Sequence, residues 1–199
     1  MKLGVMQGVV KRFRHETSGV AAVEFAFIVP VMLALYFLTM EFSQAIDTNK
    51  KVGRVASQVA DLVTQAGSVD RNDLDAIMKI GESILQPYAR SNVEVEIVGI
   101  KITDEKEPKA LVTWSRKMQD GNFTRGLSKD TEVAVPDSLL IPNTFLVRAI
   151  SSLDYAPVIT WSASGRKSTG LVAAFDSINM SERYFLRPRM SPSIDCGDC

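Results

Sequence analysis

The sequence is poor in the side chains that most enzymes and metal sites use. Among 199 residues there is one histidine, His15, and there are two cysteines, Cys196 and Cys199. The chain beyond residue 15 therefore has no Ser-His or Cys-His nucleophile pair and no imidazole metal ligand. The many carboxylates show no constellation typical of acid–base catalysis. We therefore expect no enzyme active site, no metal and no cofactor.

The chain also has no net charge, because 23 Lys and Arg residues balance 23 Asp and Glu residues. A nucleic-acid partner is accordingly not favoured. The charges are nevertheless unevenly distributed. Residues 1–19 hold four basic and one acidic side chain, a net +3, so the remainder carries a net −3. A basic tip on a mildly acidic body is typical of membrane topology rather than of a polyanion partner.

One long apolar run follows the basic tip. Residues 20–42 read VAAVEFAFIVPVMLALYFLTMEF, and Glu24 is the only charge from Val20 to Met40. As a helix, the part from Val20 to Met40 would be about 31 Å long, which matches a bilayer core of about 30 Å. The sequence therefore predicts a transmembrane helix, in which Pro30 favours a kink. The preceding basic residues indicate a cytoplasmic N-terminus, although three basic residues at positions 50–54 weaken this asymmetry.

Three interpretations of this run compete. The first is a secretory signal peptide with a small-residue cleavage site at Ser43-Gln44-Ala45, for which the apolar core is slightly too long. The second is a plain signal anchor. The third depends on Glu24, because a carboxylate at the bilayer centre costs about 2.5–3.5 kcal/mol. Glu24 either reaches the headgroups or meets a cation from another chain.

The residues around Glu24 favour pairing with a cation from another chain. The string Ser18-Gly19-Val20-Ala21-Ala22-Val23-Glu24-Phe25 combines a basic leader, a glycine, a carboxylate five residues later and an aromatic residue. It resembles the processing site of the Tad/Flp class of type IV prepilins, and residues 10–45 resemble the TadE/TadG pseudopilin family. In that family a membrane aspartyl prepilin peptidase cuts after the glycine and leaves glutamate as the fifth mature residue.

This resemblance implies a cut between Gly19 and Val20 and a recognition or assembly role for Glu24. Phe25 would occupy the aromatic position, where the family often has tyrosine. The amine that cleavage frees on Val20 is cationic near neutral pH. It could pair with Glu24 of a neighbouring chain and set the stagger between helices, because an unmatched carboxylate is costly in a low dielectric.

The pattern predicts four parts: a basic leader over 1–19, a transmembrane helix over 20–42, a helical stalk over 43–67 and an extracytoplasmic α+β head over 68–199. Gly67 is the expected stop of the stalk. Its apolar stripe, spaced in threes and fours, could pack on its own head or on a partner chain. The stripe consists of Ile46, Val52, Val55, Val59, Leu62, Val63 and Ala66.

The head is predicted to hold one helix followed by an antiparallel sheet. The helix covers residues 70–86, with Asp70 as its cap, Asp73 at N3 and Pro87 as its end. One helix face carries Leu74, Ile77, Gly81, Ile84, Leu85 and Tyr88. Strands are expected over 93–102, with a bulge near Gly99 and a change of phase, and over 110–116 and 144–151. The second of these carries Ala110, Val112 and Trp114 on one side. Weaker strand signals lie at 158–162, 171–175 and 184–187, and residues 117–143 read as loops.

The remaining motifs suggest little chemistry. The segment Cys196-Gly197-Asp198-Cys199 lacks two ligands for a zinc site and opens no helix, as a redox motif of this spacing would. A local disulfide in an oxidising periplasm is favoured, with a bond to a partner chain as the remaining option. Residues 164–170 fail the spacing of a phosphate loop. Arg187-Pro188-Arg189 reads as a surface patch, and Glu94 and Glu96 as an exposed strand face.

The resemblance implies a minor pseudopilin or assembly component of a tight-adherence (Flp) pilus, involved in adhesion and biofilm formation. Its partners would be the membrane, a prepilin peptidase and other pilin or pseudopilin subunits. It would cross the bacterial inner membrane once, with a periplasmic head or a final position in the pilus or at the cell surface. The alternative is an uncleaved, membrane-anchored periplasmic binding or scaffolding protein.

Overall fold

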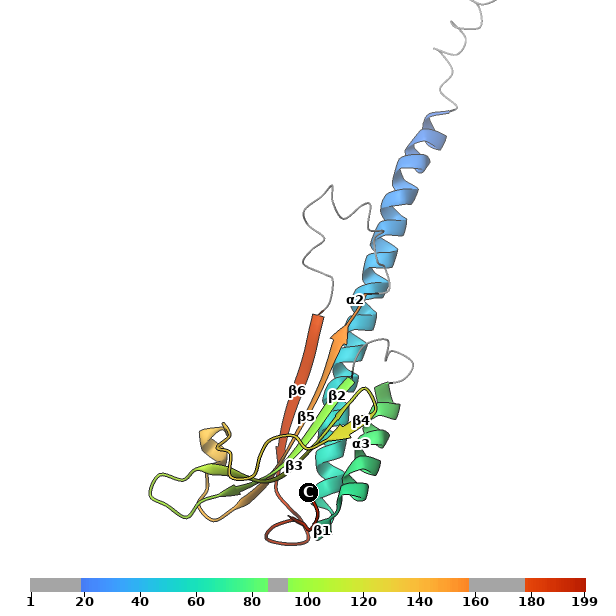
Figure 1. Ribbon diagram of the computed structural model, residues 1–199. Coiled ribbons are helices and arrows are strands. Elements are labelled where there is room, and N and C mark those ends of the chain that lie inside the picture. The colour runs from blue at the N-terminus through green and yellow to red at the C-terminus, as the bar shows by residue number, and fades with distance from the viewer. Residues whose placement is uncertain (1–18, 86–92, 158–177) are drawn as a thin grey trace, which may run out of the picture. The chain divides into compact units, whose positions relative to one another are not determined.

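The computed structural model describes residues 19–85, 93–157 and 178–199 (Figure 1). The chain divides into two compact units, Met1–Ser43 and Gln44–Cys199. Helix α2 spans Val20–Thr64 and begins where the amide of Val23 donates to the carbonyl of Gly19 at 3.1 Å. It includes Pro30 and ends at Thr64, three residues before the predicted stop at Gly67. At this end, the carbonyl of Thr64 accepts a hydrogen bond from the amide of Arg189 at 2.9 Å.

The second unit contains helix α3, Arg71–Leu85, close to its predicted bounds. A reciprocal pair of hydrogen bonds closes its first turn. The Asp70 carboxylate accepts from the amide of Asp73 at 2.8 Å, and the Asp73 carboxylate accepts from the amide of Asp70 at 3.1 Å. This capping box confirms Asp70 as the helix cap. The predicted positions of Pro87 and Tyr88 lie outside the described residues.

An antiparallel sheet follows, in the order β4-β3-β2-β5-β6, which confirms the α+β class (Figure 1). Two further short strands, β1 and β7, pair in parallel. The strands are β1 Ser68–Val69, β2 Val93–Ile102, β3 Ala110–Gln119, β4 Asn122–Thr124, β5 Phe145–Tyr155, β6 Ile178–Leu186 and β7 Asp195–Cys196. The predictions for 158–162 and 171–175 lie outside the described residues.

Residues 117–143 are more ordered than the predicted loops. They include the end of β3, all of β4 and a 3-10 turn over Asp137–Leu139. Asp120 and Gly121 join β3 to β4 with φ values of 51° and 73°. An Asp-Gly pair with positive φ is the usual connection of a tight hairpin, so this signal was present in the sequence and was missed.

The predicted bulge near Gly99 exists, but its extra residue lies in β3. Gly99 pairs with Trp114 and Ile100 pairs with Val112, so Thr113 has no partner in the ladder. Because side chains alternate along a strand, this insertion turns Trp114 to the face opposite that of Val112. The prediction that the two residues share one side is therefore wrong.

Strand β2, by contrast, keeps its alternation. It pairs with β5 without any shift of register. The apparent change of phase arises because the face that bears Glu94 and Glu96 at one end of β2 is covered by apolar residues farther along. These apolar residues form the smaller of two hydrophobic clusters in the head. It contains Val98, Ile100, Ile102, Ala110, Val112 and Leu146, with Leu127, Val133, Val135, Leu139 and Leu140 packed against it.

The larger core joins both helices to one face of the sheet. The sequence left open whether the apolar stripe of the stalk packs on its own head or on a partner chain. The structure shows that the buried part of the stripe packs on its own head, whereas Ile46 and Leu62 remain exposed. The core includes Val52, Val55, Val59 and Val63 of α2, Leu74, Met78 and Leu85 of α3, and Val95, Ile97, Trp114, Met118, Val147, Ala149 and Leu153 of the sheet.

At Gly81, the backbone of α3 lies close to side chains of α2. A Cβ atom there would lie 2.9 Å from Cγ1 of Val55 and 3.0 Å from Cγ2 of Val59. We expect Gly81→Ala to lower the free energy of unfolding by about 1 kcal/mol, because overpacking outweighs the gain in helix propensity. Thermal unfolding of the full chain in detergent, followed by circular dichroism, measures this. Ser83→Ala, at an exposed position on the same helix, is the control and should change stability little. A stabilised Gly81→Ala variant would contradict the close packing of Gly81 against Val55 and Val59.

One ion pair links the sheet to α3, and another links two neighbouring strands within the sheet. Arg116 of β3 donates through Nε and Nη2 to the two carboxylate oxygens of Asp75 on α3, at 2.7 and 2.8 Å. These hydrogen bonds raise the pKa of Arg116 although burial opposes them. On the other face, Arg148 donates to Glu96 at 3.2 Å. Burial lowers the pKa of Arg148, while the Glu96 carboxylate partly counteracts this and Arg183 adds to it.

Glu96 therefore does not lie on an exposed strand face, as the sequence predicted. Its side chain is 15% exposed, against 36% for Glu94. The reason is its position on the central strand β2, where Gly126 approaches so closely that a Cβ there would lie 2.8 Å from Oε1 of Glu96. Glu94 pairs with Lys117 at 2.9 Å. Both carboxylates are therefore held by cations from neighbouring strands.

Candidate assembly site and the cysteine pair

The predicted processing site lies at the start of α2. Gly19 is the last residue before the helix, and Val20 is its first residue. Gly19 is exposed, and a Cβ added there would meet no atom within 4 Å. The peptide bond between them thus joins an uncrowded glycine to a helix end. A peptidase that needs a non-helical backbone on one side of its target could reach this bond.

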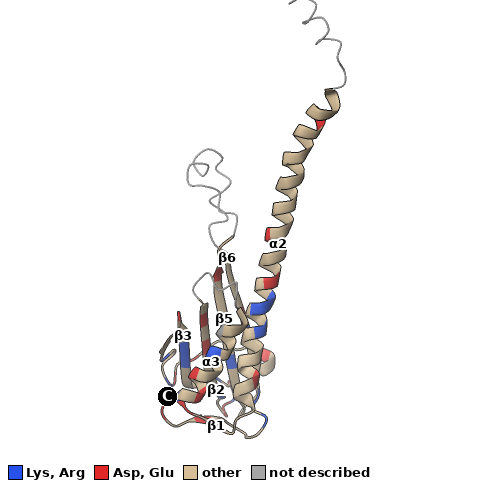
Figure 2. Ribbon diagram, turned by 90° about the vertical axis from the view of Figure 1, so that its right-hand side faces the viewer, with Lys and Arg blue, Asp and Glu red and all other residues tan. Residues whose placement is uncertain are grey.

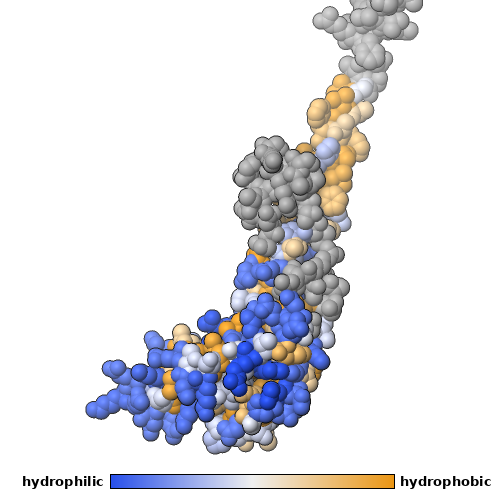
Figure 3. Space-filling view, viewed as in Figure 1, coloured by the Kyte–Doolittle hydropathy of each residue, from blue (hydrophilic) through white to orange (hydrophobic). Residues whose placement is uncertain are grey.

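The first half of α2 presents a mostly apolar surface (Figure 3). Between Val20 and Phe42 the large exposed hydrophobic side chains keep from 45% of their surface, at Phe37, to 75%, at Phe27. Figure 2 shows few charged residues along this part of the helix. Among the described residues, α2 is the one helix long and apolar enough to cross a membrane. Such a surface is suited to lipid or to other apolar helices rather than to water.

Glu24 interrupts this surface one helical turn after Val20. Within the described part of the chain it forms no ion pair and no side-chain hydrogen bond. Phe25 beside it is 68% exposed. A carboxylate in an apolar surface needs a cation or a route to water. Ion pairing is therefore the interaction that this apolar setting favours for Glu24.

A comparison with protein families identifies this part of the chain. Residues 19–61 match the family described as TadE-like protein. The TadE-like match begins at Gly19 and continues along α2 as far as Asp61, so it confirms the resemblance over the shared residues 19–45. A search of curated proteins gave no match, and a search of solved structures gave none either. The TadE-like segment indicates a component associated with a Tad pilus, and the helix is consistent with a single-pass membrane protein.

The two cysteines lie in the second unit, outside the matched residues. Cys196 and Cys199 form a disulfide with a Cα–Cα distance of 5.6 Å. Their sulfur atoms and a carboxylate oxygen of Asp198 lie within 4.8 Å of one another, a grouping that could in principle hold a metal. The disulfide occupies both sulfurs, however, and Asp198 pairs with Arg71 at 3.1 Å. In this oxidised form the three groups are not available as metal ligands.

The patch predicted at residues 187–189 is not simply a solvated surface. Arg189 pairs with Asp61 of α2, and its amide donates to Thr64 at 2.9 Å. A basic residue 128 positions beyond its acidic partner has no recognisable spacing in the sequence. Analysis of the sequence therefore missed this contact. The phosphate-loop segment 164–170 lies outside the described residues.

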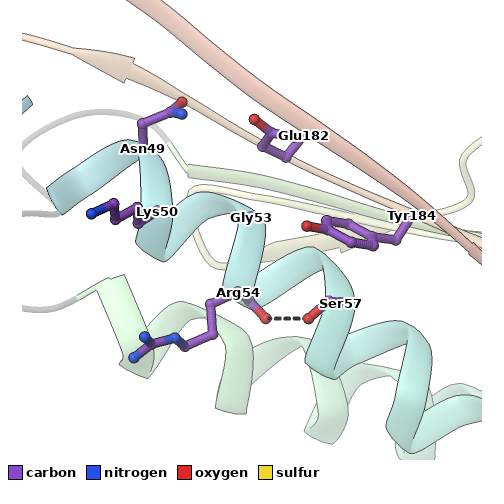
Figure 4. A pocket seen from close by; sticks show the side chains of 7 residues that line it. All are labelled: Asn49, Lys50, Gly53, Arg54, Ser57, Glu182 and Tyr184. Atoms are coloured by element: carbon purple, nitrogen blue, oxygen red, sulfur yellow. Dashed lines mark hydrogen bonds between the residues drawn. The ribbon is translucent and has the colours of Figure 1, made fainter. Parts of the chain in front are cut away.

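A shallow hollow of about 430 Å³ lies between α2 and β6 (Figure 4). Glu182 and Tyr184 face the helix there, next to Gly53, whereas Lys50 and Arg54 extend away from β6. The polar groups therefore do not converge on one point.

Proposed function

We propose that this chain is a minor pseudopilin or assembly component of a tight-adherence (Flp) pilus, and that a prepilin peptidase cuts it between Gly19 and Val20. Three features that agree on the same cleavage position support the proposal. The TadE-like match starts at Gly19, helix α2 starts at Val20, and the carboxylate of Glu24 occupies the fifth position of the chain that the cut would leave.

The exposed apolar face of α2 supports a role within a bundle of helices. Before assembly this face would lie in the inner membrane, with the basic leader in the cytoplasm and the head in the periplasm. In the assembled state, helices from other pilin or pseudopilin subunits would cover it. The head would then be displayed outside, where it would serve adhesion and biofilm formation. This role is structural and needs no catalytic residue.

The pairing of charges would determine how neighbouring helices align. Cleavage frees the amine of Val20, which is cationic near neutral pH. In a helix bundle, Glu24 of one chain could neutralise that amine on the next chain. Leaving either charge alone in an apolar bundle is unfavourable, so the pair would select one axial stagger over others.

Cleavage is tested by determining the N-terminus of the protein extracted from membranes. We expect the chain to begin at Val20, and Gly19→Leu to keep the leader, because a side chain at this position would prevent close approach of the peptidase to the scissile bond. Gly8→Leu, which alters a glycine within the leader, is the matched control and should be cleaved. An N-terminus at Met1 in cells with active peptidase would favour the uncleaved anchor, and one at Ile46 would indicate a signal peptide.

A further inference from the structure

The residues around the disulfide close one end of the head unit (Figure 1). Strand β7 pairs in parallel with β1, which directly precedes α3. Just before β7, Ile194 is fully buried, and its carbonyl accepts from the indole of Trp114 at 2.7 Å. Arg189 is bound to α2 through both its amide and its guanidinium. Residues 189–194 are therefore held without any help from the disulfide.

The contacts made after Cys196 are of a different kind. The Asp198 carboxylate accepts from the backbone amide of Arg71 at 3.0 Å and from its Nε at 3.1 Å. The carbonyl of Cys199 accepts from Nη2 of Arg125 at 2.7 Å. These polar contacts are exposed, whereas Cys196 and Cys199 are partly buried against the larger core. Exposed polar contacts are weak unless the backbone is already placed.

Asp198 supplies the N-terminal turn of α3 with a partner that the helix itself lacks. The first amides of a helix have no intrahelical acceptor. Asp70 accepts from the amides of Asp73 and Leu74. The amide of Arg71 instead depends on Asp198, which lies 127 residues further along the chain.

We propose that the Cys196–Cys199 disulfide is a redox-sensitive latch that docks Asp198 onto the N-terminal turn of α3. The bond closes a ring of four residues, which fixes the direction of Asp198 and leaves its carboxylate facing Arg71. When the ring opens, Asp198 gains backbone freedom, and two exposed hydrogen bonds cannot offset this entropy. Residues 197–199 then leave the helix, while residues 189–194 stay in place and β7 keeps its pairing with β1.

The chemistry is thiol–disulfide exchange. In closing, the thiolate of one cysteine attacks a sulfur of a partner disulfide, and the second cysteine displaces the partner from the mixed disulfide. The protein loses two electrons and two protons, and the partner is reduced to two thiols. In opening, a phosphine reductant takes the place of the partner and is oxidised to its phosphine oxide with uptake of one water. Both cysteines are left as thiols.

Hydrogen exchange of individual amides, measured by NMR on the full chain in detergent, tests the latch. We expect tris(2-carboxyethyl)phosphine to accelerate exchange of the Arg71 amide about tenfold, because a charge-assisted hydrogen bond is lost. The amides of β2 and β5 should not change. In Asp198→Ala the Arg71 amide should exchange fast in both redox states. Asp195→Ala, which removes a neighbouring exposed carboxylate, should keep the response of the wild type.

Two results would overturn the proposal. Equal protection of Arg71 before and after complete reduction would mean that Asp198 docks without the ring. A simultaneous rise in exchange throughout β2 and β5 would mean that the disulfide supports the whole head rather than one helix end. Neither result would bear on cleavage at Gly19, so the latch and the proposed function are tested separately.

Discussion

Glu24→Gln is expected to give a protein whose leader is removed normally but which does not enter a pilus assembly. Glutamine keeps the size of the side chain and loses its charge, so the freed amine of Val20 on a neighbouring chain would have no counterion. Removing one partner of a buried ion pair costs about 3–5 kcal/mol, which lowers an association constant more than a hundredfold. The N-terminus of the membrane-bound protein and the yield of sheared pili measure the two effects.

Glu41→Gln is the matched control for this experiment. It removes an equivalent charge from the same helix, 17 residues further along and close to the end of the apolar run. We expect it to leave both cleavage and piliation close to normal. Normal piliation with Glu24→Gln would contradict the charge pairing. Loss of cleavage in that variant would instead assign Glu24 to peptidase recognition.

Gly99→Ala is expected to produce the largest loss of stability from a single methyl group in the head. A Cβ atom at Gly99 would lie 2.4 Å from Cε2 and 2.6 Å from Nε1 of Trp114. The indole is buried and its N–H donates to Ile194, so it cannot move away without giving up that hydrogen bond. Overpacking costs about 1–3 kcal/mol and the lost hydrogen bond about 1 kcal/mol, so we expect a decrease of about 3 kcal/mol.

Chemical unfolding of the full chain in detergent, followed by near-ultraviolet circular dichroism, measures this decrease. Gly67→Ala is the matched control, because a Cβ there would meet no atom within 4 Å. It should change stability by less than about 0.5 kcal/mol, as surface substitutions usually do. If both alanine variants unfold at the same denaturant concentration as the wild type, the contact between Gly99 and Trp114 is not as close as described.

The elements that could be predicted are those whose signals are local. The first part of α2 was predictable from a long apolar run, and its second part from apolar positions that repeat every three or four residues. Asp70 caps α3 because Asp73 follows it at the spacing of a capping box. The proposed processing site likewise rests on a local pattern, since Gly19 and Glu24 are five residues apart. Each of these patterns fits within a few turns of helix and needs no knowledge of the rest of the chain.

The features that could not be predicted depend on distant strands. One unpaired residue, Thr113, decides which face of the sheet Trp114 occupies, and the hydrophobic pattern of β3 alone does not reveal it. The partly buried position of Glu96 follows from its place on a central strand with Gly126 above it. An alternating strand reads the same whether its polar face is open or covered.

The amino-acid sequence by itself determined the apolar helix, the acidic residue within it and the α+β plan of the head, because periodicity and local capping act over a few residues. Only the tertiary structure decided that the stripe of α2 packs on its own head, that Trp114 crosses to the helix side of the sheet, and that Asp198 reaches Arg71. The last of these contacts joins residues 127 positions apart. They form because the folded sheet and helices offset the entropy of closing such long loops, a balance that no local pattern encodes.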